Sequence, residues 1–352
     1  MRARFCTSTE PGQQVLGLWH NPAATRQEKQ VNAMRSIFLA LGMILAVPAL
    51  AQTRLVFGTN WYPEAEHGGF YQAVAEGLYK KHGLDVTIKP GGPQVNGLQL
   101  LLAGQIDLFM GYDTQSIKVL EQDLPVVTVA ATFQKDPTVI ISHPDVVRLE
   151  DLKGRPIAIG AASDNTFWPW LRARFGYSDS QKRPYAFSVQ PFLADPRLSQ
   201  QGYVTSEPYS VQKGGIKPAV FLLADQGYPP YAETIVITRD TLAKRGDPVK
   251  RFIQASAEGW KRYLDSPGPG NALIKKDNPQ MEDDLIAHGI RTMKQYAIVT
   301  GGDAARQGIM TMTDARWKQT HDFMLSAGLV KPGVDYRKAY TLELLKDVRV
   351  LP

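Results

Sequence analysis

The loop that follows the first apolar run of the chain holds side chains well suited to binding a small molecule. Asn60, Trp61 and His67 lie there, beside a proline and two carboxylates. An indole offers a flat face on which a heteroaromatic ring stacks for about 1–3 kcal/mol, although a tryptophan beside a strand also packs into cores. His67 either contacts a ligand or only caps the helix that begins next to it. We place all three residues in a candidate binding site, with Trp61 as its stacking wall.

Glu207 is the polar side chain that we expect to anchor such a ligand. A carboxylate in a mostly apolar cleft is costly unless it is paired. A flat ligand with two N–H donors would pair with it in a charge-assisted, bidentate arrangement. The alternative is a surface glutamate that precedes a proline. If Glu207 is a lone cleft carboxylate, Glu207→Gln should leave the unliganded fold as stable as the wild type.

Four further residues complete the candidate site. Tyr112 follows a predicted strand and is either a second aromatic wall or a packing residue. Ser163, Asn165 and Thr166 occupy the predicted start of a helix, where hydroxyl and amide side chains act as N-caps. Helix N-termini also attract anionic ligand atoms, so we expect both capping and ligand contact. The helix that follows carries three aromatic residues that we expect to pack inside the fold, namely Phe167, Trp168 and Trp170.

The hydrophobic pattern around Trp61 predicts a βαβ unit. Residues 55–57 are apolar and predict a strand, and apolar residues recur every four positions from Phe70 to Leu78, which predicts a helix. Gly83 is a typical C-cap for this helix, and residues 86–88 predict the next strand. In open α/β sheets, ligands bind at the carboxyl ends of the strands. The loop with Trp61 therefore lies where a ligand is expected.

The rest of the chain alternates predicted strands and helices as far as residue 240 and is mostly helical thereafter, with a helix start at Pro248. The further predicted strands are residues 105–110, 126–133, 138–142, 157–160, 220–223 and 234–238. This alternation favours an α/β fold with mainly parallel sheets. We predict two lobes: residues 52–139 and 240–352 form lobe 1, and residues 140–239 form lobe 2.

Composition excludes several classes of protein. The formal net charge is +6, but without residues 1–51 the chain has 35 basic and 32 acidic side chains, which is too balanced for a nucleic-acid-binding protein. Cys6 is the only cysteine, so an internal disulfide and a thiolate zinc site are excluded. None of the six histidines lies in a His-Glu-x-x-His arrangement. We predict no metal, no cofactor and no nucleic-acid partner.

The segment after Met34 has the features of a secretory signal peptide. Arg35 precedes an apolar run at residues 37–47, and the sequence Ala-Leu-Ala ends at Ala51. The run is shorter than the roughly 20 residues that a membrane span requires, and the small-x-small pattern is typical of a cleavage site. We predict secretion to the periplasm with a mature chain from about Gln52, and we suggest that translation starts at Met34.

Three separated motifs resemble one family. They are Asn60-Trp61-x5-His67-Gly68-x-Phe70-Tyr71, then Leu102-Ala103-Gly104-Gln105-Ile106-Asp107, and finally the pair Leu149-Glu150-Asp151-Leu152-Lys153-Gly154 and Ser206-Glu207-Pro208-Tyr209. Together they resemble the secreted solute-binding proteins of ABC importers, in the branch of thiamine pyrimidine precursor-binding proteins. The resemblance covers about residues 54–265. It implies a two-lobed type 2 periplasmic binding protein that closes over a small ligand by a hinge motion, and a permease with its ATPase as partners. We expect a monomer.

Two alternatives stay open at this point. Within transport, the ligand could be another small aromatic or a sulfonate, although a carboxylate in the pocket disfavours a sulfonate. Residues 187–202 also depart from the simple helix usual in the pyrimidine-binding branch.

The second alternative is an enzyme rather than a transport protein, namely a thiamine pyrimidine synthase-like enzyme. The resemblance implies that such an enzyme needs a lysine and a histidine after the strand that ends at Met110, plus cysteines, and here Gly-Tyr-Asp-Thr-Gln follows. We therefore predict a binding protein without enzymatic activity.

Overall fold

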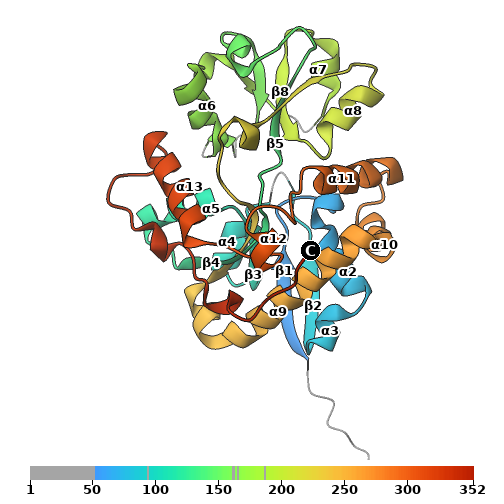
Figure 1. Ribbon diagram of the computed structural model, residues 1–352, viewed down its shortest axis with the longest axis vertical. Helices are drawn as coiled ribbons and strands as arrows, with labels where there is room; N and C mark the ends of the chain where they lie inside the picture. Colours follow the sequence, from blue (N-terminus) through green and yellow to red (C-terminus); the bar gives the residue numbers. More distant parts are fainter. Residues whose placement is uncertain (1–51, 93–94, 161–162, 165, 186–187) are drawn as a thin grey trace, which may run out of the picture. The chain divides into compact units, whose positions relative to one another are not determined.

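The computed structural model in Figure 1 describes residues 52–92, 95–160, 163–164, 166–185 and 188–352. The chain divides into two units, Met1–Leu50 and Ala51–Pro352, and the fold described below belongs to the second. The predicted signal peptide and Asn165 lie outside the described residues. Within the described ranges, none of the helices combines the length and the apolarity of a membrane span.

The first sheet extends the predicted βαβ unit. Its strand order is β2-β1-β3-β10-β4. The strands are β1 (Thr53–Gly58), β2 (Leu84–Lys89), β3 (Leu108–Gly111), β4 (Val126–Phe133) and β10 (Ala232–Thr238). β1 pairs in parallel with β2 and β3, whereas β10 is antiparallel to β3 and β4. All eight residues of β4 are buried, because helices cover the apolar faces of this sheet.

The second sheet has the strand order β7-β6-β8-β5-β9. Its strands are β5 (Thr138–Ser142), β6 (Ile157–Ile159), β7 (Lys182–Pro184), β8 (Ser199–Tyr203) and β9 (Ala219–Leu222). β6 is parallel to β7 and β8, and β5 is antiparallel to β8 and β9. The two sheets therefore each carry five strands of mixed direction.

The strand directions correct the expectation of mainly parallel sheets. The chain leaves the first sheet through β4 and returns to it through β10, so these two neighbours run in opposite directions. β5 and β9, which enter and leave the second sheet, are antiparallel for the same reason.

The position of β10 also differs from the prediction. The predicted boundaries include its residues in lobe 2, but β10 pairs in the first sheet. The chain thus crosses between the sheets after β4 and after β9.

Helices accompany both sheets. Those of the second sheet are α6 (Phe167–Phe175), α7 (Gln190–Ala194) and α8 (Glu207–Lys213). Those of the first part of the chain and of its C-terminal third are α2 (Gly68–Ala75), α3 (Leu78–Lys81), α4 (Gly97–Leu102), α5 (Asp113–Lys118), α9 (Arg239–Asp265), α10 (Gly268–Asp277), α11 (Asp283–Gln295), α12 (Ala304–Gln307) and α13 (Asp314–Ser326). α2 lies beside α9 and α10, and α13 beside α5, although these pairs are far apart in sequence (Figure 1).

Glycines let α2 and α9 approach closely. A Cβ atom added to Gly69 would lie 2.2 Å from the Trp260 ring, and one added to Gly259 would lie 2.2 Å from the carbonyl oxygen of Gly69. Phe70 of α2 also packs on Phe57 of β1, with ring centroids 4.7 Å apart. This packing fixes the start of α2, and therefore the end of the loop that holds the predicted site.

The helix predicted from residue 70 is divided in two, because Gly77 adopts a φ of +67° between α2 and α3. Gly83, with a φ of +70°, ends the second part as expected. The predicted helix start at Pro248 is instead a kink inside α9, where Arg245 leaves the helical conformation. A proline ring clashes with the carbonyl group four residues earlier, here that of Lys244, which accounts for the kink.

Candidate ligand-binding site

Backbone packing sets the position of Trp61. Its carbonyl oxygen accepts hydrogen bonds from the Thr59 hydroxyl, at 2.9 Å, and from the Gly91 N–H, at 3.1 Å. A Cβ atom at Gly91 would lie 2.3 Å from the Thr59 carbonyl oxygen, so this approach requires glycine. The indole is partly exposed and meets Tyr62 edge-on, with ring centroids 5.6 Å apart. Ligand stacking on Trp61 stays a prediction.

A chain of hydrogen bonds joins three of the predicted residues. His67 Nε2 donates to Asn60 Oδ1 at 3.1 Å, and Asn60 Nδ2 donates to the Tyr112 hydroxyl at 3.2 Å. The Tyr112 hydroxyl lies 2.7 Å from that of Tyr203 on β8. Asn60 and Tyr112 follow β1 and β3, which are parallel neighbours, so both lie at the carboxyl ends of strands, where ligands bind. The chain of bonds therefore runs from the first sheet to the second.

His67 supports this chain as a neutral imidazole. Its side chain is fully buried in the 3-10 helix η1 (Ala65–His67). Burial lowers the pKa of His67 to about 3, and the backbone of Tyr62 opposes this shift only weakly. The proton on Nε2 is directed at Asn60, so the structure assigns His67 the role of orienting that amide.

Glu207 begins α8 and is already paired by the protein. The Tyr185 hydroxyl donates to Oε1 at 2.6 Å, while the Tyr203 N–H and the Ser206 hydroxyl donate to Oε2 at 2.7 and 2.5 Å. The expectation of an unpaired cleft carboxylate is therefore wrong, because the turn after β8 aims its own donors at Glu207. Burial, followed by the charge of Glu207, raises the pKa of Tyr185 well above its usual range, which keeps this phenol a donor.

Two more glutamates lie near Glu207 and a third lies near those two, and we call the four together the acidic cluster. They are Glu64, Glu66, Glu207 and Glu233. Burial raises the pKa of Glu66 to about 7, and the nearby Thr205 hydroxyl opposes this rise. Burial, reinforced by the neighbouring carboxylates, also raises the pKa values of Glu64 and Glu233 well above their usual range. Because like charges at close range disfavour ionisation, Glu64, Glu66 and Glu233 hold protons that a cationic or donor-rich ligand could replace.

A small, partly open pocket adjoins the acidic cluster. Its lining comes from the loop and 3-10 helix before α2, the turn before α8, and the start of α11, and consists of Glu64, Ala65, Glu66, Thr205, Ser206, Met281, Leu285 and Ile286. The polar members are acceptors or hydroxyls, and the apolar ones are Ala65 of the 3-10 helix, Met281 just before α11, and Leu285 and Ile286 of α11. The pocket is thus suited to a small group that carries N–H donors on an apolar frame.

Ser163 does not act as the expected N-cap. Its hydroxyl is buried and donates to Gln201 Oε1 at 2.8 Å, and this oxygen also accepts the Gly160 N–H at 2.6 Å. Thr166 occupies the N-cap position of α6 without a capping hydrogen bond from its side chain. The capping expectation is therefore wrong for both residues, because Ser163 lies three residues before the N-cap position with its hydroxyl directed at Gln201, and the Thr166 side chain accepts no N–H of the helix. Ligand contact by Ser163, Asn165 and Thr166 stays a prediction.

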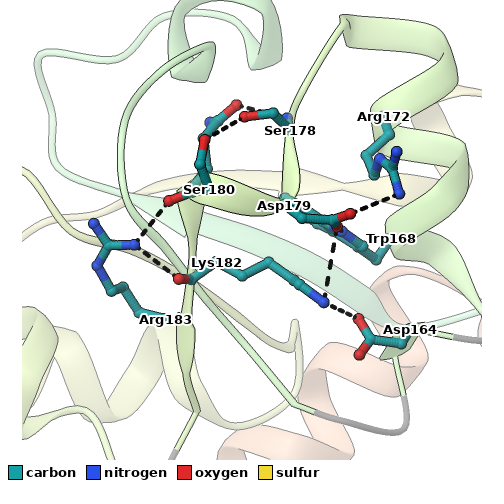
Figure 2. Close-up of polar contacts among 9 residues, drawn as sticks. Asp164, Trp168, Arg172, Ser178, Asp179, Ser180, Lys182 and Arg183 are labelled. Atoms are coloured by element: carbon teal, nitrogen blue, oxygen red, sulfur yellow. Dashed lines mark hydrogen bonds and ion pairs between the residues drawn. The ribbon is translucent and has the colours of Figure 1, made fainter.

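An ion-pair network holds this turn from the outside, as Figure 2 shows. Lys182 of β7 lies 2.7 Å from Asp164 and 3.8 Å from Asp179. Asp179 also pairs with Arg172 at 3.0 Å and accepts the indole N–H of Trp168 at 2.8 Å. The Trp168 ring is buried, as are those of Phe167 and Trp170, which confirms that these aromatic residues pack within the fold.

Sequence reasoning missed six polar residues of the site. They are Glu64, Glu66, Tyr185, Tyr203, Thr205 and Glu233. Glu66 lay within the loop already singled out, and its pairing with a second carboxylate two residues earlier was an available signal. Glu233 carries no such signal, because it reaches the site through the pairing of β10 with β3 and through its own positive φ of 51°. In the part of the chain that the structure describes, no three His, Cys, Asp or Glu side chains form a metal-ligand set.

Comparison with curated proteins identifies two relatives. A formylaminopyrimidine-binding protein of Halalkalibacterium halodurans is 24% identical over 283 residues, which cover 75% of this chain and 84% of the relative. A protein of Haemophilus influenzae assigned to thiamine biosynthesis is 25% identical over 127 residues, or 35% of this chain and 40% of the relative.

Solved structures share the fold at low identity. The ligand-binding component of an ABC-type import system from Staphylococcus aureus aligns with a TM-score of 0.61 and 12% identity, covering 84% of this chain and 99% of the other. The periplasmic aliphatic sulphonate-binding protein of Escherichia coli gives 0.59 and 17%, with coverage of 81% and 91%. The desulfurization enzyme DSZB gives 0.58 and 12%, with coverage of 84% and 99%. The fold is therefore the two-lobed α/β fold of periplasmic binding proteins, which also serves an enzyme.

A match to a family profile identifies the family of this chain and confirms the resemblance seen in the sequence motifs. The profile described as "NMT1/THI5 like" matches residues 64–269, more than half of the chain, and its span includes Glu66, Tyr112 and Glu207. We conclude that this chain belongs to the NMT1/THI5-like family.

Proposed function

We propose that this chain is the solute-binding component of an ABC importer and captures a small heteroaromatic of the aminopyrimidine class between its two lobes. One observation carries the proposal. Hydrogen bonds link His67, Asn60 and Tyr112 to Tyr203, whose own N–H donates to Glu207. A single polar network thus connects both sheets at the carboxyl ends of their strands, where a ligand held between the lobes would meet it.

The charge of the site supports this class of ligand. The acidic cluster supplies acceptors, and no Lys or Arg of the described residues forms an ion pair with any of its four members. An aminopyrimidine offers N–H donors, whereas a sulfonate would need donors from the protein and would be repelled by carboxylates. The name of the Halalkalibacterium halodurans relative, a formylaminopyrimidine-binding protein, fits the same chemistry.

We further propose that the protein acts in the periplasm as a monomer with an inner-membrane permease and its ATPase. The signal-peptide pattern at residues 34–51 and the import proteins among the structural neighbours support this. Mass spectrometry of the periplasmic fraction should find a mature chain that begins near Gln52. Recovery of the chain mainly from the cytoplasm with residues 34–51 intact would contradict the location.

We also propose that the chain has no enzymatic activity. The carboxyl end of β3 leads to Tyr112 and Asp113. The Asp113 carboxylate is fully buried and accepts hydrogen bonds at 2.9 Å from both the Tyr231 N–H and the Thr320 hydroxyl. Asp113 therefore holds the fold together at a position where a synthase-like enzyme would need reactive groups. Incubation with pyridoxal phosphate and iron should yield no pyrimidine and no loss of a histidine.

A thermal-shift screen of pyrimidines, flavins, sulfonates and aromatic acids tests the central assignment. A ligand present at 100 times its dissociation constant stabilises the folded state by about 2.7 kcal/mol, which is readily visible as a rise in Tm. We expect aminopyrimidines to raise Tm and sulfonates to leave it unchanged. A rise with sulfonates alone would refute the aminopyrimidine assignment.

A further inference from the structure

Two members of the acidic cluster have carboxylate oxygens that the protein leaves unused. Glu66 is only 2% exposed and Glu233 only 1%. Among the described residues, Glu66 Oε1 and both carboxylate oxygens of Glu233 have no hydrogen-bond partner. The Thr205 hydroxyl, also 1% exposed, lies close to Glu66 without the geometry of a hydrogen bond. Buried acceptors without donors are costly, so these atoms indicate a group that is supplied from outside the chain.

The contrast with Glu207 shows where that group would bind. Glu207 accepts three hydrogen bonds from Tyr185, Tyr203 and Ser206, so its position is fixed by the protein. Glu66 and Thr205, by comparison, line the pocket beside α11. A primary ammonium group carries three N–H donors and no acceptor. It could therefore donate to Glu66, to Thr205 and to a third acceptor in the same pocket, such as Glu64.

We propose that the pocket formed by Glu64, Glu66 and Thr205 against Leu285 and Ile286 is a subsite for a positively charged amino group of the ligand. This inference rests on the proposed function and deepens it, because it assigns the class of substituent. The protein selects an aromatic ligand that carries a primary ammonium group over the analogue in which the same position is a neutral hydroxyl or an N-formyl amide.

The apolar side of the pocket limits the size of the charged group. Met281, Leu285 and Ile286 close the pocket on the α11 side, and Gly289 of α11 approaches Ala65 so closely that an added Cβ atom would lie 2.9 Å from the Ala65 side chain. A compact –CH₂–NH₃⁺ substituent places its charge on the carboxylates and its methylene on the apolar side chains. A formyl group would bring a carbonyl oxygen towards acceptors.

The ionisable groups that face Glu66 set the pH dependence of the subsite. They are Glu64 and His67 on its own segment, Glu207 on α8, Glu233 on β10 and Tyr263 on α9. His67 stays neutral because its pKa is about 3. Burial raises the pKa of Glu66 to about 7. An ammonium group binds the ionised carboxylate, so its binding releases a proton and tightens as the pH rises from 5.5 to 8.

The experiment is a calorimetric titration of the chain from Gln52 with two matched series. The first contains aminopyrimidines that carry an aminomethyl, a hydroxymethyl or a formylaminomethyl substituent. The second contains benzylamine, benzyl alcohol and N-benzylformamide. We expect the aminomethyl pyrimidine to bind at least about tenfold more tightly than its two neutral analogues at pH 8. Between pH 5.5 and 8 its affinity should rise by about tenfold or more, and the affinity of the neutral analogues should not rise.

Substitutions of pocket residues test whether Glu66 and Thr205 themselves form the subsite. Glu66→Gln keeps the shape and removes the charge, and it should weaken binding of the aminomethyl pyrimidine by about tenfold or more while changing the hydroxymethyl analogue less than about threefold. Thr205→Val should weaken the same ligand by a smaller factor. Glu343→Gln is the matched control, because Glu343 is an exposed residue of the 3-10 helix η8 (Glu343–Leu345), outside the pocket. The pH series uses the wild type, so the inference remains open to test even if a variant fails to fold.

The outcomes separate this inference from the proposed function. Equal affinity for the three pyrimidines, or an aminomethyl affinity that does not rise with pH, overturns the subsite and leaves the aminopyrimidine assignment standing. Tight binding of benzylamine without binding of any pyrimidine supports the subsite and removes the aminopyrimidine assignment. Absence of binding in both series overturns both. Displacement of the amine by one equivalent of Mg²⁺, Ca²⁺ or Zn²⁺ would assign the carboxylates to a metal and overturn the subsite.

Discussion

At the scale of single residues, the site divides its carboxylates into two kinds. Glu207 is held by three donors of its own lobe, whereas Glu66 and Glu233 are buried with oxygens that no described residue satisfies. The first kind is part of the folded scaffold, and the second kind depends on a ligand. This difference cannot be deduced from residue types, because all three are glutamates, and it changes what a substitution should do.

Glu207→Gln should destabilise the unliganded protein, contrary to the expectation from the sequence. An amide at this position offers one acceptor and one NH₂ group where Tyr185, Tyr203 and Ser206 present donors. At least one buried donor then loses its partner, at a cost of about 1–3 kcal/mol. Urea unfolding should show this loss, and Tyr185→Phe, which removes one donor only, should show a smaller one. A midpoint equal to that of the wild type would mean that these hydrogen bonds contribute nothing.

Trp61→Ala should weaken ligand binding more than it weakens the fold. The indole is partly exposed and meets Tyr62 edge-on, so it is not part of the fully buried core. Loss of stacking should cost about 1–3 kcal/mol of binding free energy, up to about two orders of magnitude in Kd. Calorimetry with the best aminopyrimidine from the screen measures this, and Tyr62→Ala is the matched control for the neighbouring ring. An unchanged Kd in Trp61→Ala would remove the tryptophan from the site.

At the scale of elements, the site depends on how closely α2 approaches α9. The first sequence motif has two consecutive glycines, Gly68 and Gly69, directly after His67. Added Cβ atoms there would lie 1.9 Å from Tyr263 and 2.2 Å from Trp260.

Individual strands could be predicted from the sequence because their patterns are local. β4 and β5, for example, begin and end where the apolar runs do. The contact with α9, almost 200 residues away, could not be predicted, because no local pattern encodes a contact at that separation.

Gly69→Ala should therefore be strongly destabilising. Overpacking of a close-packed contact costs about 1–3 kcal/mol, and more where the backbone must shift. Gly246→Ala in α9 is the control, because an added Cβ atom there meets only the Leu344 side chain, at an ordinary contact distance of 3.8 Å, and alanine is the better helix former. Thermal unfolding should show a clear drop for the first variant and no drop for the second. Equal stability of the two variants would contradict the close contact of α2 and α9.

At the scale of the whole molecule, contacts between distant segments bring α8 and α11 together beside the pocket. Lys213 of α8 lies 2.5 Å from Glu282 and 3.0 Å from Asp284, and Tyr209 donates to Asp284 at 2.9 Å. The Tyr209 ring also stacks on His288, with centroids 4.6 Å apart.

The sequence predicted two lobes and their order along the chain. It did not show that β10 belongs to the first sheet, because a strand that returns across a hinge looks locally like any other buried strand.

Stability should fall as the pH rises from about 5 to 7.5. Burial raises the pKa of Asp113 and of Glu66 to about 7, and that of Asp136 to about 6. Between the unfolded and folded pKa values the folded state binds more protons, so its stability decreases as these protons are lost. One pKa unit corresponds to about 1.4 kcal/mol, and we expect a total loss of at least about 2 kcal/mol in urea titrations. A midpoint that rises over this interval would contradict the buried, protonated state of these carboxyls.

The central claim is that an aminopyrimidine binds between the lobes on the network that ends at Glu207. The most direct test is calorimetric titration of the best aminopyrimidine into the wild type and into Glu207→Gln, with circular dichroism to confirm that both are folded. We predict one ligand per chain for the wild type and a Kd at least about tenfold weaker for the variant, because loss of a hydrogen bond from Tyr185 or Tyr203 to Glu207 loosens the network that the ligand meets. Equal affinity in the two proteins would show that the network ending at Glu207 does not support the ligand and would contradict the account.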